Sequence, residues 1–369
     1  MPEDVSLKHK IALGLIPRIG DISARKLVAH FGSVEAVFHE SYRTLTRIPG
    51  IGPGLASYIS DRSYLDIAEK EAEYVDKHNI KTYFYLDSDY PFRLRQCEDS
   101  PVVFFFKGKC DLDSAKILSV VGTRSATPRG REICDKIIGS LAEGHPELVI
   151  VSGLAYGIDI AAHKAALAFN LATVGVLANG LKTIYPSIHK STAEAMLNNG
   201  GLVTDFLSDA LPERNNFIKR NRIIAGISDA TLVVESGIKG GALITADIAA
   251  SYNRDVLAVP GRPDDQWSAG CNSLIKSNKA ALVESSGDIE YFLDWKPEKS
   301  KAPVQKTLFS EMTDTEKMIF DLLAKESEMT IDAICRSLDL PVYKLSPLLL
   351  QMEFKGLVKF FPGNVYRTT

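Results

Sequence analysis

Short apolar runs recur between residue 116 and about residue 290, and helix-forming stretches separate them. The runs start roughly 25–30 residues apart, which is the spacing of strand–helix–strand units. Because the runs are continuous rather than alternating, we expect a sheet that is covered on both faces. The pattern therefore predicts an α/β fold with a doubly wound sheet, whose ligand lies outside the carboxyl ends of the strands. The predicted strands are 117–121, 148–151, 173–177, 202–204, 231–234 and 256–259.

Two further regions precede this alternation. Aromatic and β-branched runs at 82–86 and 102–106 predict two more strands, which we expect at an edge of the main sheet. Residues 1–80 are predicted to be helical, with similar glycine turns at 16–20 and 48–54. The second turn resembles the hairpin of helix-hairpin-helix DNA-binding modules, since a glycine turn before a helix exposes amide groups to an anion. An ordinary turn between packed helices explains it equally well.

A polar stretch with two prolines, residues 297–312, predicts a linker before the C-terminal segment. Thr313 and Glu316 have the spacing of a capping box, and three helices followed by a hairpin are typical of a winged helix. Its third helix carries one cation, Lys344, which favours a partner-binding or regulatory role over the reading of duplex DNA. The predicted segments are a helical domain at 1–80, an α/β domain at 81–296, the linker, and a winged helix at 313–369.

Composition limits the function. The chain has 369 residues and a net charge of −3, so a nucleic-acid contact must be a local positive patch. No apolar run of about 18 residues is present and the N-terminus lacks the pattern of a signal peptide, which predicts a cytoplasmic protein with no membrane contact. The five cysteines are scattered without Cys-x-x-Cys spacing, so we expect buried thiols rather than a disulfide frame or a zinc site.

The densest positive charge lies at the start of a predicted amphipathic helix, residues 217–228. Cations can meet phosphates there and an aromatic ring offers bases a stacking face, so the segment suits a nucleotide chain. A solvated basic face is the alternative. The candidate contact residues of this segment are Arg214, Phe217, Lys219, Arg220, Asn221 and Arg222.

Three strand ends that contain glycine, at 122–124, 152–153 and 239–241, are predicted to converge on the same place. After the first strand, a glycine lets the backbone approach a ligand and Arg124 adds a guanidinium that can hold a phosphate. After a later strand, Gly240 and Gly241 open a helix, whose free amides and dipole favour a phosphate. We expect Arg124, Arg222 and the bend at 239–241 to share one trough. The candidate residues of the strand ends are Gly122, Thr123, Arg124, Ser152, Gly153, Lys239, Gly240, Gly241 and Thr245.

Enzymatic alternatives have weaker support. Neither the dinucleotide fingerprint nor a P-loop is present, so no cofactor is predicted. Asp159 and His163 are spaced as a possible pair, for which a structural role is favoured over catalysis because no nucleophile is evident. The alternative function is a hydrolase that cleaves N-glycosidic bonds of nucleoside monophosphates, with Glu235 or Asp159 as its carboxylate.

Several motifs occur together and in order, including Val-Gly-Thr-Arg124, Ser-Gly-Leu-Ala-Tyr-Gly-Ile-Asp159, Phe-x-x-Arg-Asn-Arg222, Gly-Gly-Ala-Leu-Ile-Thr245 and Val-Pro-Gly261. Over at least residues 80–290 the chain resembles the DprA (Smf) family of DNA-processing proteins. The resemblance implies an extended Rossmann-like domain, flanked by a SAM-like or helix-hairpin-helix-like domain and a winged helix. It implies a non-catalytic protein that binds single-stranded DNA entering during natural transformation, protects it and loads the RecA recombinase. It also implies a homodimer through the Rossmann-like domain, with single-strand binding protein as a further partner.

Within this resemblance, Arg124 corresponds to a phosphate-binding arginine, and Arg214, Phe217, Arg220 and Arg222 fall on the DNA-contact segment, where Phe217 is a candidate for base stacking. The chain departs from the family pattern in three segments. Thr123 replaces the commoner serine, Lys219 stands in place of a small residue or proline, and Lys239-Gly240-Gly241 stands where the family often has Ser-Gly-Ser.

Overall fold

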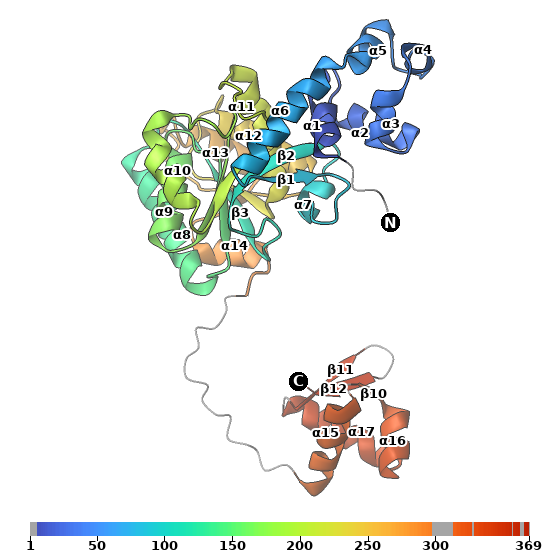
Figure 1. Ribbon diagram of the computed structural model, residues 1–369. Coiled ribbons are helices and arrows are strands. Elements are labelled where there is room, and N and C mark those ends of the chain that lie inside the picture. Colours follow the sequence, from blue (N-terminus) through green and yellow to red (C-terminus); the bar gives the residue numbers. More distant parts are fainter. Residues whose placement is uncertain (1–5, 297–312, 327, 356, 362–364, 369) are drawn as a thin grey trace. The chain divides into compact units, whose positions relative to one another are not determined.

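The structure is a computed structural model that describes residues 6–296, 313–326, 328–355, 357–361 and 365–368. The chain forms two compact units, residues 1–298 and 299–369 (Figure 1). The predicted helical domain therefore belongs to the same unit as the α/β domain, whereas the predicted linker at 297–312 lies outside the described residues.

The first unit is built on a nine-stranded sheet with the order β1-β2-β6-β5-β4-β3-β7-β8-β9. From β6 to β9 all neighbouring strands are parallel, which confirms the predicted doubly wound sheet. The antiparallel strands β1 and β2 extend one edge, as the aromatic runs predicted. The two-residue strand β9 was not predicted, because it is too short to give an apolar run. The strands are β1 Lys81–Phe84, β2 Val103–Gly108, β3 Ile117–Val121, β4 Val149–Ser152, β5 Ala172–Val176, β6 Gly201–Thr204, β7 Ala230–Val233, β8 Asp255–Ala258 and β9 Ala281–Leu282.

Helices cover both faces of this sheet because successive strand residues point to opposite sides. Along β3, Ile117 and Val121 join the core under α7, α11, α12 and α13, whereas Leu118 and Val120 join the core under α8, α9 and α14. The helices, with the short 3-10 helix η1, are α7 Phe92–Arg95, α8 Pro128–Gly144, α9 Ile158–Ala168, η1 Ser187–His189, α10 Lys190–Met196, α11 Arg214–Ile227, α12 Gly241–Ser251, α13 Ala269–Lys276 and α14 Ser286–Phe292.

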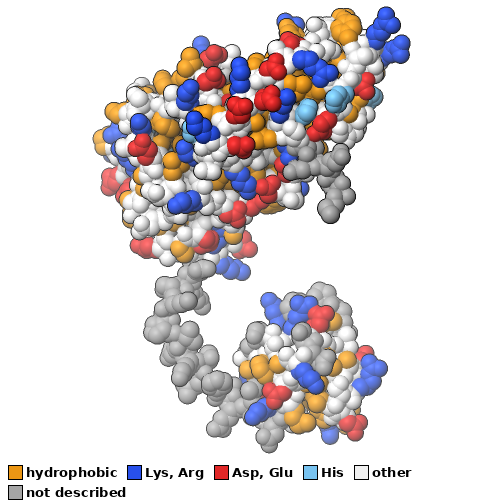
Figure 2. Space-filling model, in the orientation of Figure 1, with side chains coloured by type: hydrophobic (Ala, Val, Ile, Leu, Met, Phe, Trp, Pro, Cys, Tyr) orange, Lys and Arg blue, Asp and Glu red, His pale blue; other side chains and the backbone are white. Residues whose placement is uncertain are grey.

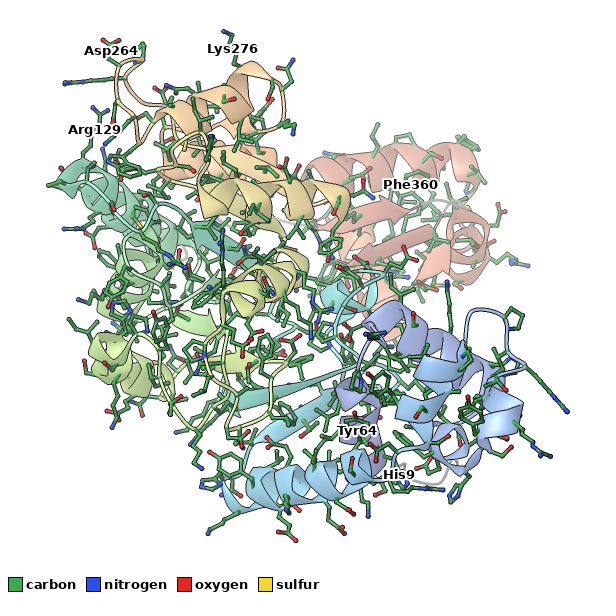
Figure 3. All side chains as sticks on the ribbon, turned by 90° about the horizontal axis from the view of Figure 1, so that it is seen from above. His9, Tyr64, Arg129, Asp264, Lys276 and Phe360 are labelled. Atoms are coloured by element: carbon green, nitrogen blue, oxygen red, sulfur yellow. The ribbon has the colours of Figure 1, made fainter. Side chains whose placement is uncertain are left out.

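The N-terminal helices pack on the antiparallel edge of the sheet. Along β2, Phe104 and Phe106 face the central core, whereas Val103 and Phe105 face the helices. Figure 3 shows His9 on α1 and Tyr64 on α6, two helices that lie against each other. Both predicted glycine turns lie between helices, before α2 and before α5. The bounds are α1 Leu7–Leu15, α2 Asp21–Phe31, α3 Val34–His39, α4 Tyr42–Leu45, α5 Pro53–Ser60 and α6 Ser63–Lys77.

The second unit has the predicted helices and hairpin, and the predicted capping box is present. The Thr313 amide donates to Glu316 Oε2 at 2.9 Å, and the Glu316 amide donates to Thr313 Oγ1 at 3.3 Å. Leu345 and Leu349 on the third helix are buried in the core of this unit. The elements are α15 Asp314–Glu326, β10 Met329–Thr330, α16 Ile331–Leu338, α17 Val342–Phe354, β11 Val358–Phe361 and β12 Val365–Thr368.

Charged side chains are mixed on the surface. Figure 2 shows Lys and Arg interspersed with Asp and Glu over the visible face of the first unit, which fits a net charge of −3. In the part of the chain that the structure describes, no helix has the length and apolarity needed to cross a bilayer.

Candidate nucleic-acid interface

A cavity of about 610 Å³ opens beyond the carboxyl end of β3. The chain passes from β3 through β4 and β5 to β6 in one direction and then returns to β7 on the other side of β3. The cavity therefore lies where strand order reverses, which is the usual ligand position in this type of sheet. Its lining residues are Val121, Gly122, Thr123, Arg124, Ala155, Asp159, Tyr185, Arg214, Phe217, Ile218, Arg220, Asn221, Ile224, Gly240, Gly241, Ala242, Ile244 and Thr245.

Helix α11 supplies one wall of the cavity. It begins at Arg214, three residues before the predicted start. Phe217, Arg220, Asn221 and Ile224 follow at the three- and four-residue spacing that places side chains on one face of a helix. The cavity thus contains Arg214, Phe217, Arg220 and Asn221 from the predicted DNA-contact segment.

The ring of Phe217 lies among three polar or aromatic groups. The Arg124 guanidinium carbon lies 5.2 Å from the ring centroid, and that of Arg220 lies 6.0 Å away. The ring of Tyr185 meets Phe217 at 5.9 Å and 64°. An aromatic face flanked by two cations is an arrangement that can hold a base together with its phosphates.

Arg220 is held rigidly although it lines the cavity. It is 3% exposed, and its Nη1 donates to the Val176 carbonyl at 2.6 Å. Burial lowers the pKa of Arg220 to about 10, although Asp159 opposes that shift. Gly153 lies directly against the guanidinium, where a Cβ atom would collide with it. The predicted residue Gly153 thus makes room for Arg220, and Ser152 is buried, with its hydroxyl donating to the Val120 carbonyl at 2.6 Å.

The start of α12, a helix that packs against α11, forms another part of the cavity wall. The N-cap residue of α12 is Gly240, so no side chain caps the first amides of this helix. Gly240, Gly241 and Thr245 all line the cavity. Free amides at a helix start attract anions. The Gly240 amide is not one of them, because it donates to the Gly237 carbonyl at 2.9 Å. Lys239, one residue earlier, is exposed and does not contribute to the lining.

Arg222 and Lys219 lie on another side of α11, so the expected trough needs correction. Arg222 donates to Asp205 Oδ2 at 2.6 Å and to Asp21 Oδ2 at 2.7 Å, and it also bonds the carbonyl of Asp99. Lys219 pairs with Asp205 at 3.4 Å. The structure brings Arg124 and the bend at Gly240 and Gly241 to one cavity, but it turns Arg222 away from that cavity, to the acidic partners Asp205 and Asp21.

The three candidate catalytic residues have different surroundings. His163 bonds the Thr173 hydroxyl at 2.7 Å, and burial lowers its pKa to about 3. Asp159 lines the cavity, and burial raises its pKa despite the nearby Arg220. Both oxygens of Glu235 accept hydrogen bonds from Thr127, at 2.5 and 2.9 Å, which holds the start of α8. Figure 3 shows Arg129, from the same helix start, beside the loop that carries Asp264.

Several cavity residues were not among the candidates from the sequence. They include Asp159, which was considered only as a catalytic residue, as well as Tyr185 and the exposed apolar residues Ile218 and Ile244. Apolar residues have no chemical signal of their own in a sequence. Their position at the cavity depends on how α11 and α12 pack.

Comparison with known proteins decides the family. Residues 81–294 match the family described as DNA recombination-mediator protein A. The chain is 31% identical to Protein Smf of Synechocystis sp. over an alignment 394 positions long, which covers 97% of both chains. The chain belongs to this family. Its N-terminal residues 10–66 match a helix-hairpin-helix motif, and residues 298–364 match the DprA winged helix domain, which confirms both predicted flanking modules.

Two solved structures of the family resemble this one. The X-ray structure of DNA processing protein A from Streptococcus pneumoniae has a TM-score of 0.63 and 30% identity, covering 77% of this chain and 97% of its own. The solved structure of DNA processing protein A from Helicobacter pylori, described for its single-stranded DNA binding mode, has a TM-score of 0.52 and 26% identity, covering 58% of this chain and 95% of its own.

Proposed function

We propose that this protein binds single-stranded DNA in the cavity at the end of β3. The observation that carries the proposal is that the ring centroid of Phe217 lies 5.2 Å from the guanidinium carbon of Arg124 and 6.0 Å from that of Arg220. Among the described residues, neither Arg124 nor Arg214 has a hydrogen bond or an ion pair, so both guanidinium groups can donate to a phosphate. The relative from Helicobacter pylori, which is described as binding single strands, adds support.

Arg124→Ala tests the phosphate contact. We expect weaker binding of oligo-dT, measured by fluorescence anisotropy, and a slope of log affinity against log salt that is shallower by about 1. The control is Lys136→Ala, which removes an exposed charge on α8 outside the cavity. An unchanged slope for Arg124→Ala would contradict the assignment of the cavity.

The alternative, hydrolysis of nucleoside monophosphates, rests on one observation. Asp159 places a carboxylate in the cavity, whereas Glu235 is occupied at the start of α8. Incubation of the parent protein with nucleoside monophosphates separates the two functions. Release of free base at enzymatic turnover, lost in Asp159→Asn, would replace the binding proposal by the hydrolase.

We further propose that the protein protects incoming single strands and loads RecA onto them in the cytoplasm, as a homodimer through the Rossmann-like domain and with single-strand binding protein as a further partner. Membership of the family supports this role. We expect the protein to accelerate RecA assembly on strands coated with single-strand binding protein. ATP hydrolysis by RecA measures this assembly. No acceleration by the parent, under conditions in which it binds the strand, would refute loading and leave binding intact.

A further inference from the structure

A small hollow adjoins the cavity on the side of the loops that follow β4 and β5. It shares Arg124, Tyr185 and Phe217 with the cavity and adds Tyr156 and Pro186. Tyr156 and Tyr185 are 48% and 46% exposed, although tyrosine rings are large and mostly apolar. We propose that these two tyrosines form a second base-stacking subsite, which takes nucleobases of the single strand outside the cavity. The proposal rests on the proposed function and extends it.

The orientation of the rings argues for separate bases. The planes of Tyr185 and Phe217 are inclined by 64°, with centroids 5.9 Å apart. One planar base cannot stack on both faces at that angle. A base on Phe217 therefore leaves the face of Tyr185 to a neighbouring nucleotide of the same strand.

Tyr156 is fixed in place rather than loose. Its ring packs at 5.2 Å and 65° against His189, and Nδ1 of this buried histidine bonds the Leu154 carbonyl at 2.8 Å. The rest of the tyrosine ring stays exposed. A ring that is anchored on one side loses little conformational freedom when a base stacks on it.

Arg124 links the two subsites. It is exposed and lines both the cavity and the hollow, and the described part of the chain offers it neither a hydrogen bond nor an ion pair. Successive bases in a strand are joined by a phosphate. A guanidinium that lines both the cavity and the hollow matches that order of base, phosphate and base.

The experiment compares Tyr156→Ala and Tyr185→Ala on two strands of equal length, oligo-dT and an abasic strand. Each variant is expected to bind oligo-dT about fivefold or more weakly, because stacking contributes about 1–3 kcal/mol per base. Binding of the abasic strand should stay close to that of the parent. Tyr156→Phe and Tyr185→Phe keep the ring and should bind both strands as the parent does.

Tyr291→Ala is the matched control, since it removes an 81% exposed tyrosine on α14 that lines neither cavity nor hollow. Urea unfolding of every variant checks that the fold is intact. If both alanine variants bind oligo-dT with the affinity of the parent, the tyrosine subsite is overturned. The same follows if they lose as much affinity for the abasic strand as for oligo-dT. Either result leaves the cavity assignment standing. Failure of the parent itself to bind oligo-dT would instead remove the proposed function.

Discussion

Replacing Arg222 by alanine is expected to lower the free energy of unfolding by about 3–5 kcal/mol, the usual effect of leaving a buried charge without its partner. The side chains of Arg222 and Asp205 are 8% and 2% exposed, and their ion pair measures 2.6 Å. Without Arg222, the buried Asp205 side chain keeps, among the described residues, only the more distant cation of Lys219, at 3.4 Å. Asp21, at the start of α2, loses the same partner, so the contact between the N-terminal helices and α11 weakens as well.

Urea unfolding followed by tryptophan fluorescence measures this change. Both tryptophans, Trp267 and Trp295, lie in the first unit, so the signal reports on that unit alone. The control is Lys279→Ala, which breaks an exposed ion pair with Asp247 at 3.0 Å and should lower stability by less than about 1 kcal/mol. A loss for Arg222→Ala no larger than that of the control would show that the buried pair does not stabilise the fold.

The difference between parent and Arg222→Ala should depend on pH. Burial by itself would raise the pKa of Asp205, but Arg222 and Lys219 hold the pKa below its ordinary value. The stabilisation that the Asp205 carboxylate contributes is therefore fully present above its pKa in the unfolded chain, which is about 3.9. It is lost as the pH falls through the lower pKa that Asp205 has in the folded state. The difference in unfolding free energy should be largest near neutral pH and shrink in acid.

Phe217→Ala is expected to weaken the binding of oligo-dT by about 5- to 150-fold, which corresponds to about 1–3 kcal/mol for the loss of one stacked base. The centroid of the Phe217 ring lies 5.2 Å from the guanidinium carbon of Arg124 and 6.0 Å from that of Arg220. Its removal also takes away the surface against which those cations are positioned. Phe217→Trp keeps an aromatic face and should retain most of the affinity.

Fluorescence anisotropy with oligo-dT measures the effect, with Phe292→Ala as the matched control. Phe292 is 46% exposed on α14 and does not line the cavity. The salt dependence of Phe217→Ala should equal that of the parent, because no charge is removed. Binding of Phe217→Ala at the parental level would mean that bases do not stack at this position.

The sequence by itself determined the architecture of the first unit. Continuous apolar runs such as 117–121 and 231–234 specify buried parallel strands, because only a sheet covered on both faces buries every residue of a strand. The ends of those strands had to meet at one edge, so the turn with Arg124 and the bend with Gly240 and Gly241 could be assigned to one site before the structure was known. Local spacing likewise specified the capping box at Thr313.

Tertiary structure alone decided which cations reach that site. Arg220 and Arg222 are two residues apart, and a helix directs such neighbours to roughly opposite sides. Their sequence context is equally basic, but Asp205 and Asp21 come from distant segments and bind Arg222, while Gly153 leaves space for Arg220 beside the cavity. Tyr156 and Tyr185 likewise line one hollow because they follow β4 and β5, which are neighbours in the sheet. Apolar spacing is a local property of the chain, whereas the partner of a charge depends on contacts between segments that are far apart in the sequence.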